Sequence, residues 1–428
     1  MTMLEFSVDE WTNISDESED DWATGQLRIA IEDDVLTRVE DLHSRSMRDH
    51  IRVSVAPLAR WLLSNYWRIM FEPLPATDSM PSIDWSLAHS MSSVGGEYVW
   101  PHLTFVTNGK ILELTGDNGP RDQSRPISFT NLNDRRFVTL ESFSEAVDGL
   151  LQQTVERVAA LHDSDLCRLW NEFLEERQDP EIVFYREIEA RLGFQPGDAP
   201  RHIVLGWGNL VEEFSERAIE EVVAAHKDLD AAKAVAEHAK ASTARLYPEC
   251  LNDIRKTSID QTSQFTGPAY LVANQLAAKV RDVLGIDGPF EDADFQDRFG
   301  LDAAASHEES SQDFAASWTR EDSLSFVHRS RNAVGRRFEL GRIVGDWLGF
   351  EQSRLRPSLD AKTWRQQFQK SFSQALLAPL NVIESMLPSG SSWDDDAIRD
   401  VAESLQVSEM TVWSTLRNNH VIARDFNS

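Results

Sequence analysis

The chain has 428 residues, of which 41% are hydrophobic, and this length and composition are typical of a globular protein with two or three domains. Its formal net charge of −29 disfavours direct binding to nucleic-acid phosphates and to anionic membranes. No apolar stretch approaches the roughly 20 residues of a membrane-spanning helix, and the two distant cysteines, Cys167 and Cys250, favour a reducing cytoplasm.

The first 24 residues are strongly acidic. They contain eight carboxylate side chains, no basic residue and two tryptophans. One interpretation is a solvated arm that binds a basic surface on a protein partner, with charge speeding the encounter and the tryptophans supplying buried contact area. The other is an edge strand in which Leu4 and Phe6 pack against a domain. The arm interpretation predicts partner contacts at Trp11, Asp16, Glu17, Glu19, Asp20, Asp21 and Trp22.

Residues 25–208 are predicted to form an α+β domain. The alternation of residues 51–55 indicates a half-buried strand, and Pro57 then begins a helical run that ends at Pro73. The dipeptide Asn108-Gly109 between two strand-like segments indicates a β-hairpin. Further helices are predicted at 142–160, 167–176 and 181–192.

Residues 209–262 are predicted to be a helical connector. The stretch 211–240 is rich in alanine, glutamate and lysine, and it places apolar residues such as Ala218 and Val222 at helical spacing. We therefore expect helices that join the α+β domain to a second domain at residues 263–428.

Residues 336–348 are the most informative stretch of the second domain. They read Arg-Arg-Phe-Glu-Leu-Gly-Arg-Ile-Val-Gly-Asp-Trp-Leu, which resembles the zinc-peptidase active helix Arg-Arg-Phe-x-Leu-Ala-His-Glu-x-Gly-His-x-Leu. The flanking pieces are an amphipathic helix at 270–284, antiparallel strands at 315–319 and 324–328, a Leu-Leu-x-Pro segment at 376–379 and a helix pair at 394–419. This order resembles the ImmA/IrrE family of zinc-peptidase-like proteins.

The resemblance implies a zincin-like fold without its zinc chemistry. In active relatives two histidines four residues apart hold the zinc, and a glutamate activates its water. The matching positions here are Arg342, Asp346 and Ile343, and an arginine in a ligand position is a permanent cation that repels a metal. We therefore expect no metal or other cofactor, and an ion pair between Arg342 and Asp346, one helical turn apart. The alternative is an unorthodox metal site of His328, Asp346 and Asp360.

The helix pair at 397–405 and 409–417 resembles a helix-turn-helix subdomain. Acidic residues outnumber basic residues around it, which argues against direct DNA binding because phosphate contacts supply much of the affinity for DNA. We therefore predict a structural role for this subdomain.

Three hypotheses from different functional classes remain. The resemblance implies an inactive metallopeptidase-like protein that binds a protein partner in stress response or in the control of mobile elements and phages. The second hypothesis is an active metallopeptidase with a rebuilt metal site. The third is an acidic mimic of DNA that occupies a DNA-binding partner.

Overall fold

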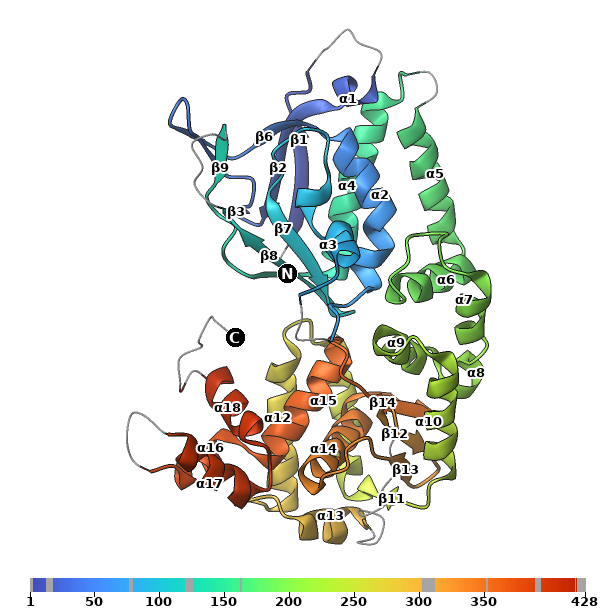
Figure 1. The fold of residues 1–428 in the computed structure, drawn as a ribbon, viewed down its shortest axis with the longest axis vertical. Coiled ribbons are helices and arrows are strands. Elements are labelled where there is room, and N and C mark those ends of the chain that lie inside the picture. The colour runs from blue at the N-terminus through green and yellow to red at the C-terminus, as the bar shows by residue number, and fades with distance from the viewer. Residues whose placement is uncertain are drawn as a thin grey trace. The chain divides into compact units, whose positions relative to one another are not determined.

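The computed structural model describes residues 3–12, 18–76, 80–119, 126–161, 164–301, 312–351, 353–388, 394–419 and 421. The chain forms two compact units, Met1–Gly208 and Asn209–Ser428. Each unit combines several helices with small antiparallel sheets, so the predicted helix-rich α+β fold class is confirmed (Figure 1). Among the described residues, no helix is both long and apolar enough to cross a membrane.

The first strand of the N-terminal unit is β1, Leu4–Asp9. It pairs antiparallel with β2, Thr24–Ile31, and Phe6 stands opposite Ile29. Leu4, Phe6 and Val8 are buried on alternate positions, as expected for a strand with one face on a core. The interpretation of residues 1–24 as a solvated arm is therefore wrong for this segment, and the edge-strand alternative holds.

The remaining elements of the N-terminal unit follow in chain order. Its strands are β3 Asp34–Val35, β4 Val39–Asp41, β5 Ser46–Arg48, β6 Ile51–Ser54, β7 His102–Thr107, β8 Ile111–Asp117, β9 Ile127–Phe129 and β10 Arg136–Thr139. Its helices are α1 Glu19–Trp22, α2 Ala56–Phe71, α3 Ile83–His89, the 3-10 turn Met91–Ser93, α4 Leu140–Val158, α5 Asp165–Gln178, α6 Pro180–Arg191 and α7 Arg201–Gly208. The predicted hairpin is the β7–β8 pair, and the helices predicted from Pro57 and at 142–192 are α2, α4, α5 and α6.

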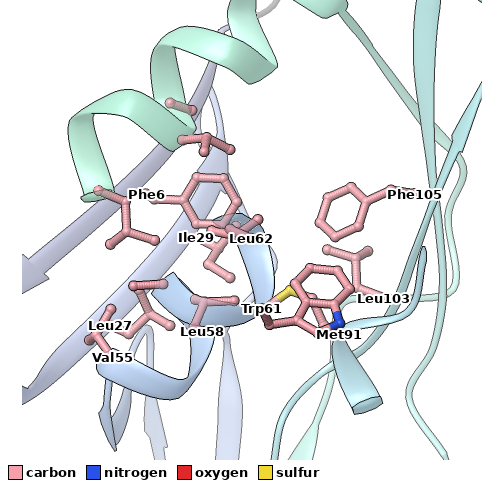
Figure 2. Packing of buried hydrophobic residues seen from close by; sticks show 14 of the residues in the cluster. Phe6, Leu27, Ile29, Val55, Leu58, Trp61, Leu62, Met91, Leu103 and Phe105 are labelled. Carbon is pink, nitrogen blue, oxygen red and sulfur yellow. The ribbon is translucent and has the colours of Figure 1, made fainter. Parts of the chain in front are cut away.

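Helix α2 is the centre of this unit's core. It begins with Pro57 in its first turn, where the missing backbone N–H leaves no intrahelical bond unmade. Leu58, Trp61 and Leu62 are buried, and Figure 2 shows them among side chains of β1, β2 and β7. The rings of Trp61 and Phe105 lie 6.2 Å apart. Each such buried side chain stabilises the unit by roughly 1.5–3 kcal/mol, which is why α2 organises the small sheets around it.

The C-terminal unit is built on a four-stranded sheet flanked by helices. The strand order is β11 (Arg245–Leu246), β13 (Leu324–Val327), β12 (Ala315–Thr319), β14 (Leu355–Ser358). Its helices are α8 Val211–Phe214, α9 Glu216–Ala225, α10 Leu229–Ala241, the 3-10 turn Pro248–Leu251, α11 Asn252–Gln264, α12 Ala269–Leu284, α13 Asp292–Phe299, α14 Ala333–Gly349, α15 Trp364–Leu377, α16 Leu380–Met386, α17 Asp395–Leu405 and α18 Glu409–Asn418. The predicted antiparallel strands and the helices predicted at 270–284, 336–349 and 394–419 are thus present.

Residues 209–262 are not a separate connector, contrary to the prediction. Helix α10 packs on β12 and β13, β11 pairs with β13, and α11 packs on α14. The alanine-rich pattern predicted helices correctly. It could not show that their apolar faces complete the core of the C-terminal unit, because that depends on which partner surface is available.

Candidate functional site

Helix α14 carries Arg342, Ile343 and Asp346, three of the residues that the sequence singled out. It begins after Asn332, whose side chain accepts a hydrogen bond from the Gly335 backbone N–H at 2.6 Å. Eleven of its residues are buried, among them Arg342, Ile343 and Asp346. The helix therefore lies inside the unit, and its charged groups must find partners there.

A glycine face lets α14 approach α15 closely. Gly341, Gly345 and Gly349 recur every four residues and therefore share one side of the helix. A Cβ added at Gly345 would lie 2.5 Å from a ring carbon of Phe372, and one at Gly349 would lie 2.8 Å from Phe368. This contact brings the polar side chains of α15 directly against Arg342 and Asp346.

Asp346 is the centre of a buried charge network. Arg365 of α15 donates two hydrogen bonds to its carboxylate, from Nε at 2.6 Å and from Nη2 at 2.7 Å. Arg356 of β14 donates to the same carboxylate at 2.9 Å. Gln369 adds an N–H donor at 2.8 Å. Asp346 is only 1% exposed, so the four donors replace water completely.

The charges of this network shift one another's pKa values. Burial raises the pKa of Asp346, but the charge of Arg365 and its hydrogen bonds outweigh burial and hold that pKa at about 2. Burial lowers the pKa of Arg356 to about 10, only partly offset by Asp346, because Arg365 repels it. The pKa of Arg365 is raised despite burial, since Asp346 and Glu221 both attract its charge. All three groups are thus ionised at neutral pH.

Glu221 of α9 adds a second buried carboxylate to the network. It accepts hydrogen bonds from Thr363 Oγ1 at 2.6 Å and from Gln366 Nε2 at 2.9 Å. Burial raises its pKa, and the nearby charge of Arg365 opposes that rise. Residues 209–262, which were predicted to be a connector, therefore supply one of the buried acids of this site.

Arg342 does not form the predicted ion pair with Asp346. Its Nη2 donates to the Leu359 carbonyl at 2.6 Å, to Gln366 Oε1 at 2.6 Å and to Gln369 Oε1 at 3.1 Å. Burial lowers the pKa of Arg342 to about 10, and its Nε has no hydrogen-bond partner in the described part of the chain. The Gln369 amide accepts from Arg342 and donates to Asp346, so it stands between the two groups.

The unorthodox metal site of His328, Asp346 and Asp360 is not formed. His328 Nδ1 bonds to Glu339 at 2.8 Å, and Asp360 pairs with Arg329 and with Lys370. Asp346 is held by the two arginines. Within the described ranges no three histidine, cysteine or acidic side chains are arranged to hold a metal ion.

The α15 and β14 residues that complete the network were not predicted from the sequence. Arg365, Gln366 and Gln369 alternate with Trp364 and Phe368 on a helix buried on both sides. Polar residues at spacings of three and four within such an apolar helix are the signal that predicts an internal polar network.

The acidic N-terminal segment contacts its own unit. The Arg157 guanidinium lies over the rings of Trp11, at 6.0 Å, and Trp22, at 5.3 Å. Glu19 pairs with Arg60 and accepts from the Leu166 backbone N–H at 3.2 Å. Asp20 also pairs with Arg60, Asp21 bonds to Ser18 in the α1 cap, and Asp16 and Glu17 lie outside the described residues. Trp11 and Trp22 are therefore packed against the core rather than presented as solvated anchors.

Comparisons with known proteins add no relative. No family model, curated protein or solved structure matches this chain. Function must therefore be argued from the arrangement of residues alone.

Proposed function

We propose that the C-terminal unit is a peptidase-like scaffold without catalytic chemistry, and that the protein acts as a protein-binding regulatory or defence-associated module in the cytoplasm. The resemblance of residues 336–348 to a zinc-peptidase helix motivates the scaffold. The observation that supports the loss of catalysis is the saturation of Asp346 by Arg365, Arg356 and Gln369.

The donor set around Asp346 is unsuited to a divalent metal. A catalytic zinc needs three protein ligands and an open position for water. At this place the carboxylate oxygens face two guanidinium groups, and the Arg342 guanidinium lies beyond Gln369. A metal would have to displace buried cations that are themselves held by the carboxylate. Ile343, at the position of the catalytic glutamate, is 1% exposed and belongs to the core.

The network also suits a binding scaffold. It ties α14, α15, β14 and α9 together through directional bonds, which fixes the relative placement of these elements more tightly than apolar contacts alone. A net charge of −29 favours a partner with a basic surface, because complementary charge speeds association.

Metal analysis tests the loss of catalysis. We expect the purified chain to carry far less than one zinc per molecule by mass spectrometry and to cleave no peptide library above background. One tightly held zinc per chain that disappears in Asp346→Ala, but stays in the exposed control Asp322→Ala, would refute the proposal.

Partner binding needs its own test. The full chain should be recovered from its native cells with a specific protein, and the two purified components should re-form the complex. We expect the affinity to fall when salt is raised above about 0.1 M, since screening shortens the reach of exposed charges to about 10 Å. If duplex DNA competes for the same partner surface, the DNA-mimic hypothesis replaces the regulatory one.

A further inference from the structure

A small cavity in the C-terminal unit shares no residue with the Asp346 network. It has a volume of about 270 Å³ and lies between α12, α15, α16 and α18, of which α12 packs on α15 and α18 contacts both α15 and α16. Typical pockets for cofactors and drug-sized ligands measure about 300–1,000 Å³. This cavity therefore suits a small metabolite and is too small for a nucleotide.

One wall of the cavity is a buried cation. Arg281 of α12 is 6% exposed and donates to the Leu376 carbonyl at 2.7 Å and to the Gly288 carbonyl. Both acceptors are neutral, and Arg281 makes no ion pair within the described residues. A guanidinium has five N–H donors, so several stay available. Burial lowers the pKa of Arg281, and the charges of Asp294, Asp287 and Asp282 oppose that shift.

Two carboxylates line the same cavity. Asp282 and Asp287 are exposed at its rim and form no ion pair in the part of the chain that the structure describes. Gln374 uses both amide N–H groups on Thr411 and Thr415, which leaves its carbonyl oxygen as an acceptor. The cavity thus offers a buried positive group and, separately, acceptors for a positive group.

Uncommitted neutral polar groups complete the lining. The side chains of Asn274, Ser371 and Asn381 make no hydrogen bond to other described residues. Ile286 and Leu380 supply apolar contact surface. Polar groups of this kind around a small apolar patch fix the orientation of a ligand rather than the fold of the protein.

We propose that this cavity binds a free α-amino acid as its zwitterion. The ligand's carboxylate would accept from Arg281, its ammonium group would donate to Asp282, Asp287 and the Gln374 carbonyl oxygen, and its side chain would lie against Ile286 and Leu380. A simple anion fits less well, since two carboxylates and the net charge of −29 oppose it. The site is independent of the proposed loss of peptidase chemistry.

The test is calorimetric titration of the full chain with each proteinogenic L-α-amino acid at up to about 10 mM, a range that detects millimolar affinity. We expect at least one to bind. Its N-acetyl and its amide derivatives should each bind at least about tenfold more weakly, because each loses one of the two charges. Phosphate and acetate should not bind.

Pairs of variants inside and outside the cavity test whether the ligand binds there. Ala278→Leu fills the cavity from an exposed helical position and should abolish binding, whereas Ala293→Leu, on an exposed position of α13 outside the cavity, should leave it unchanged. Asp287→Asn should weaken binding at least about fivefold, and Asp297→Asn should not. The proposal is overturned if no amino acid binds the folded chain, if the acetylated and amidated forms bind equally well, or if Ala278→Leu has no effect.

Discussion

Helices α2 and α14 each carry an arginine and a carboxylate four residues apart, yet of these two pairs only the one on α2 forms an ion pair. On α2, Arg68 Nε donates to Glu72 at 2.6 Å. On α14, Arg342 and Asp346 have the same spacing, but Asp346 bonds to Arg365 and Arg356. Glutamate has one more methylene than aspartate and reaches along its own helix. The shorter Asp346 keeps its carboxylate near the helix axis, where α15 can approach across the glycine face. Spacing alone therefore predicts a pair only where no tertiary partner reaches the carboxylate first.

The largest expected effect concerns the tertiary pair. Arg365→Ala leaves Asp346 buried with Arg356 as its one remaining cation, and removing one partner of a buried pair costs about 3–5 kcal/mol. Urea unfolding of the C-terminal unit measures this loss. The control is Arg399→Ala, an exposed helical arginine paired with Asp396, which should cost less than about 1 kcal/mol. Equal costs would mean that the Asp346 network does not stabilise the fold.

Acid should destabilise the two units at different pH values. His89 of the N-terminal unit is fully buried beside Arg68, and burial lowers its pKa from 6.5 to about 4. A depressed pKa means that the unfolded chain binds the proton first, so stability is lost as pH falls from 6.5 to about 4. The loss should not exceed about 3–4 kcal/mol, because the pKa falls from 6.5 to about 4 and each pKa unit corresponds to about 1.4 kcal/mol.

The C-terminal network should lose stability in a more acidic window. The pKa of Asp346 falls from 3.8 to about 2, so its contribution is complete above 3.8 and is lost below it. Hydrogen exchange, corrected for intrinsic rates, should therefore show α2 peptides losing protection between pH 6.5 and 4.5 while α14 peptides keep theirs. In His89→Gln the pH dependence of α2 should flatten. An unchanged slope would show that His89 is not the titrating group.

Replacing a helical glycine by alanine should have a smaller effect, of opposite sign in the two units. Gly345→Ala places a Cβ 2.5 Å from Phe372, and such overpacking costs about 1–3 kcal/mol. Gly149→Ala on α4 meets no atom within 4 Å and should stabilise the N-terminal unit by up to about 1 kcal/mol, because alanine has the higher helix propensity. Thermal melts of the two variants measure both changes. A stabilising Gly345→Ala would show that α14 and α15 can separate at little cost.

The sequence predicted most local elements because their signals are local. Pro57 and Pro73 bracket α2, and Asn108-Gly109 marks the turn of the β7–β8 hairpin. Periodicity also indicates burial, but it does not name the surface that covers a face. Periodicity therefore predicts the helices of residues 209–262 but not the sheet and helix that cover them, and it does not decide whether β1 is an arm or an edge strand. Leu4, Phe6 and Val8 are buried at alternate positions of β1, and the acidic residues between them do not prevent this, because charges at the outward positions stay solvated.

The sequence predicted the candidate-site residues on α14, but it did not predict the residues of α15 and β14 that bind them. The sequence singles out Arg342, Ile343 and Asp346 as candidate site positions. Their actual neighbours, Arg365 and Gln369, lie on another helix, and the close approach that joins them depends on the glycine face. Three glycines at spacings of four were a readable signal for that approach, and they would have shown that α14 faces another helix rather than an open cleft.

The smallest expected effect is the coupling between Arg342 and Asp346 themselves. Because Gln369 lies between the two groups, a double-mutant cycle of Arg342→Ala and Asp346→Ala should give a coupling energy below about 1 kcal/mol, whereas the cycle of Arg365→Ala and Asp346→Ala should give about 2–3 kcal/mol. The bridging role can be isolated by repeating the first cycle in a Gln369→Met background, which keeps the side-chain volume but removes the amide. The Arg342–Asp346 coupling should then be weaker than in the chain that keeps Gln369, because the amide no longer links the two groups. A first cycle as strong as the second would show a direct contact that the amide does not mediate, and the contrast between α14 and α2 would disappear.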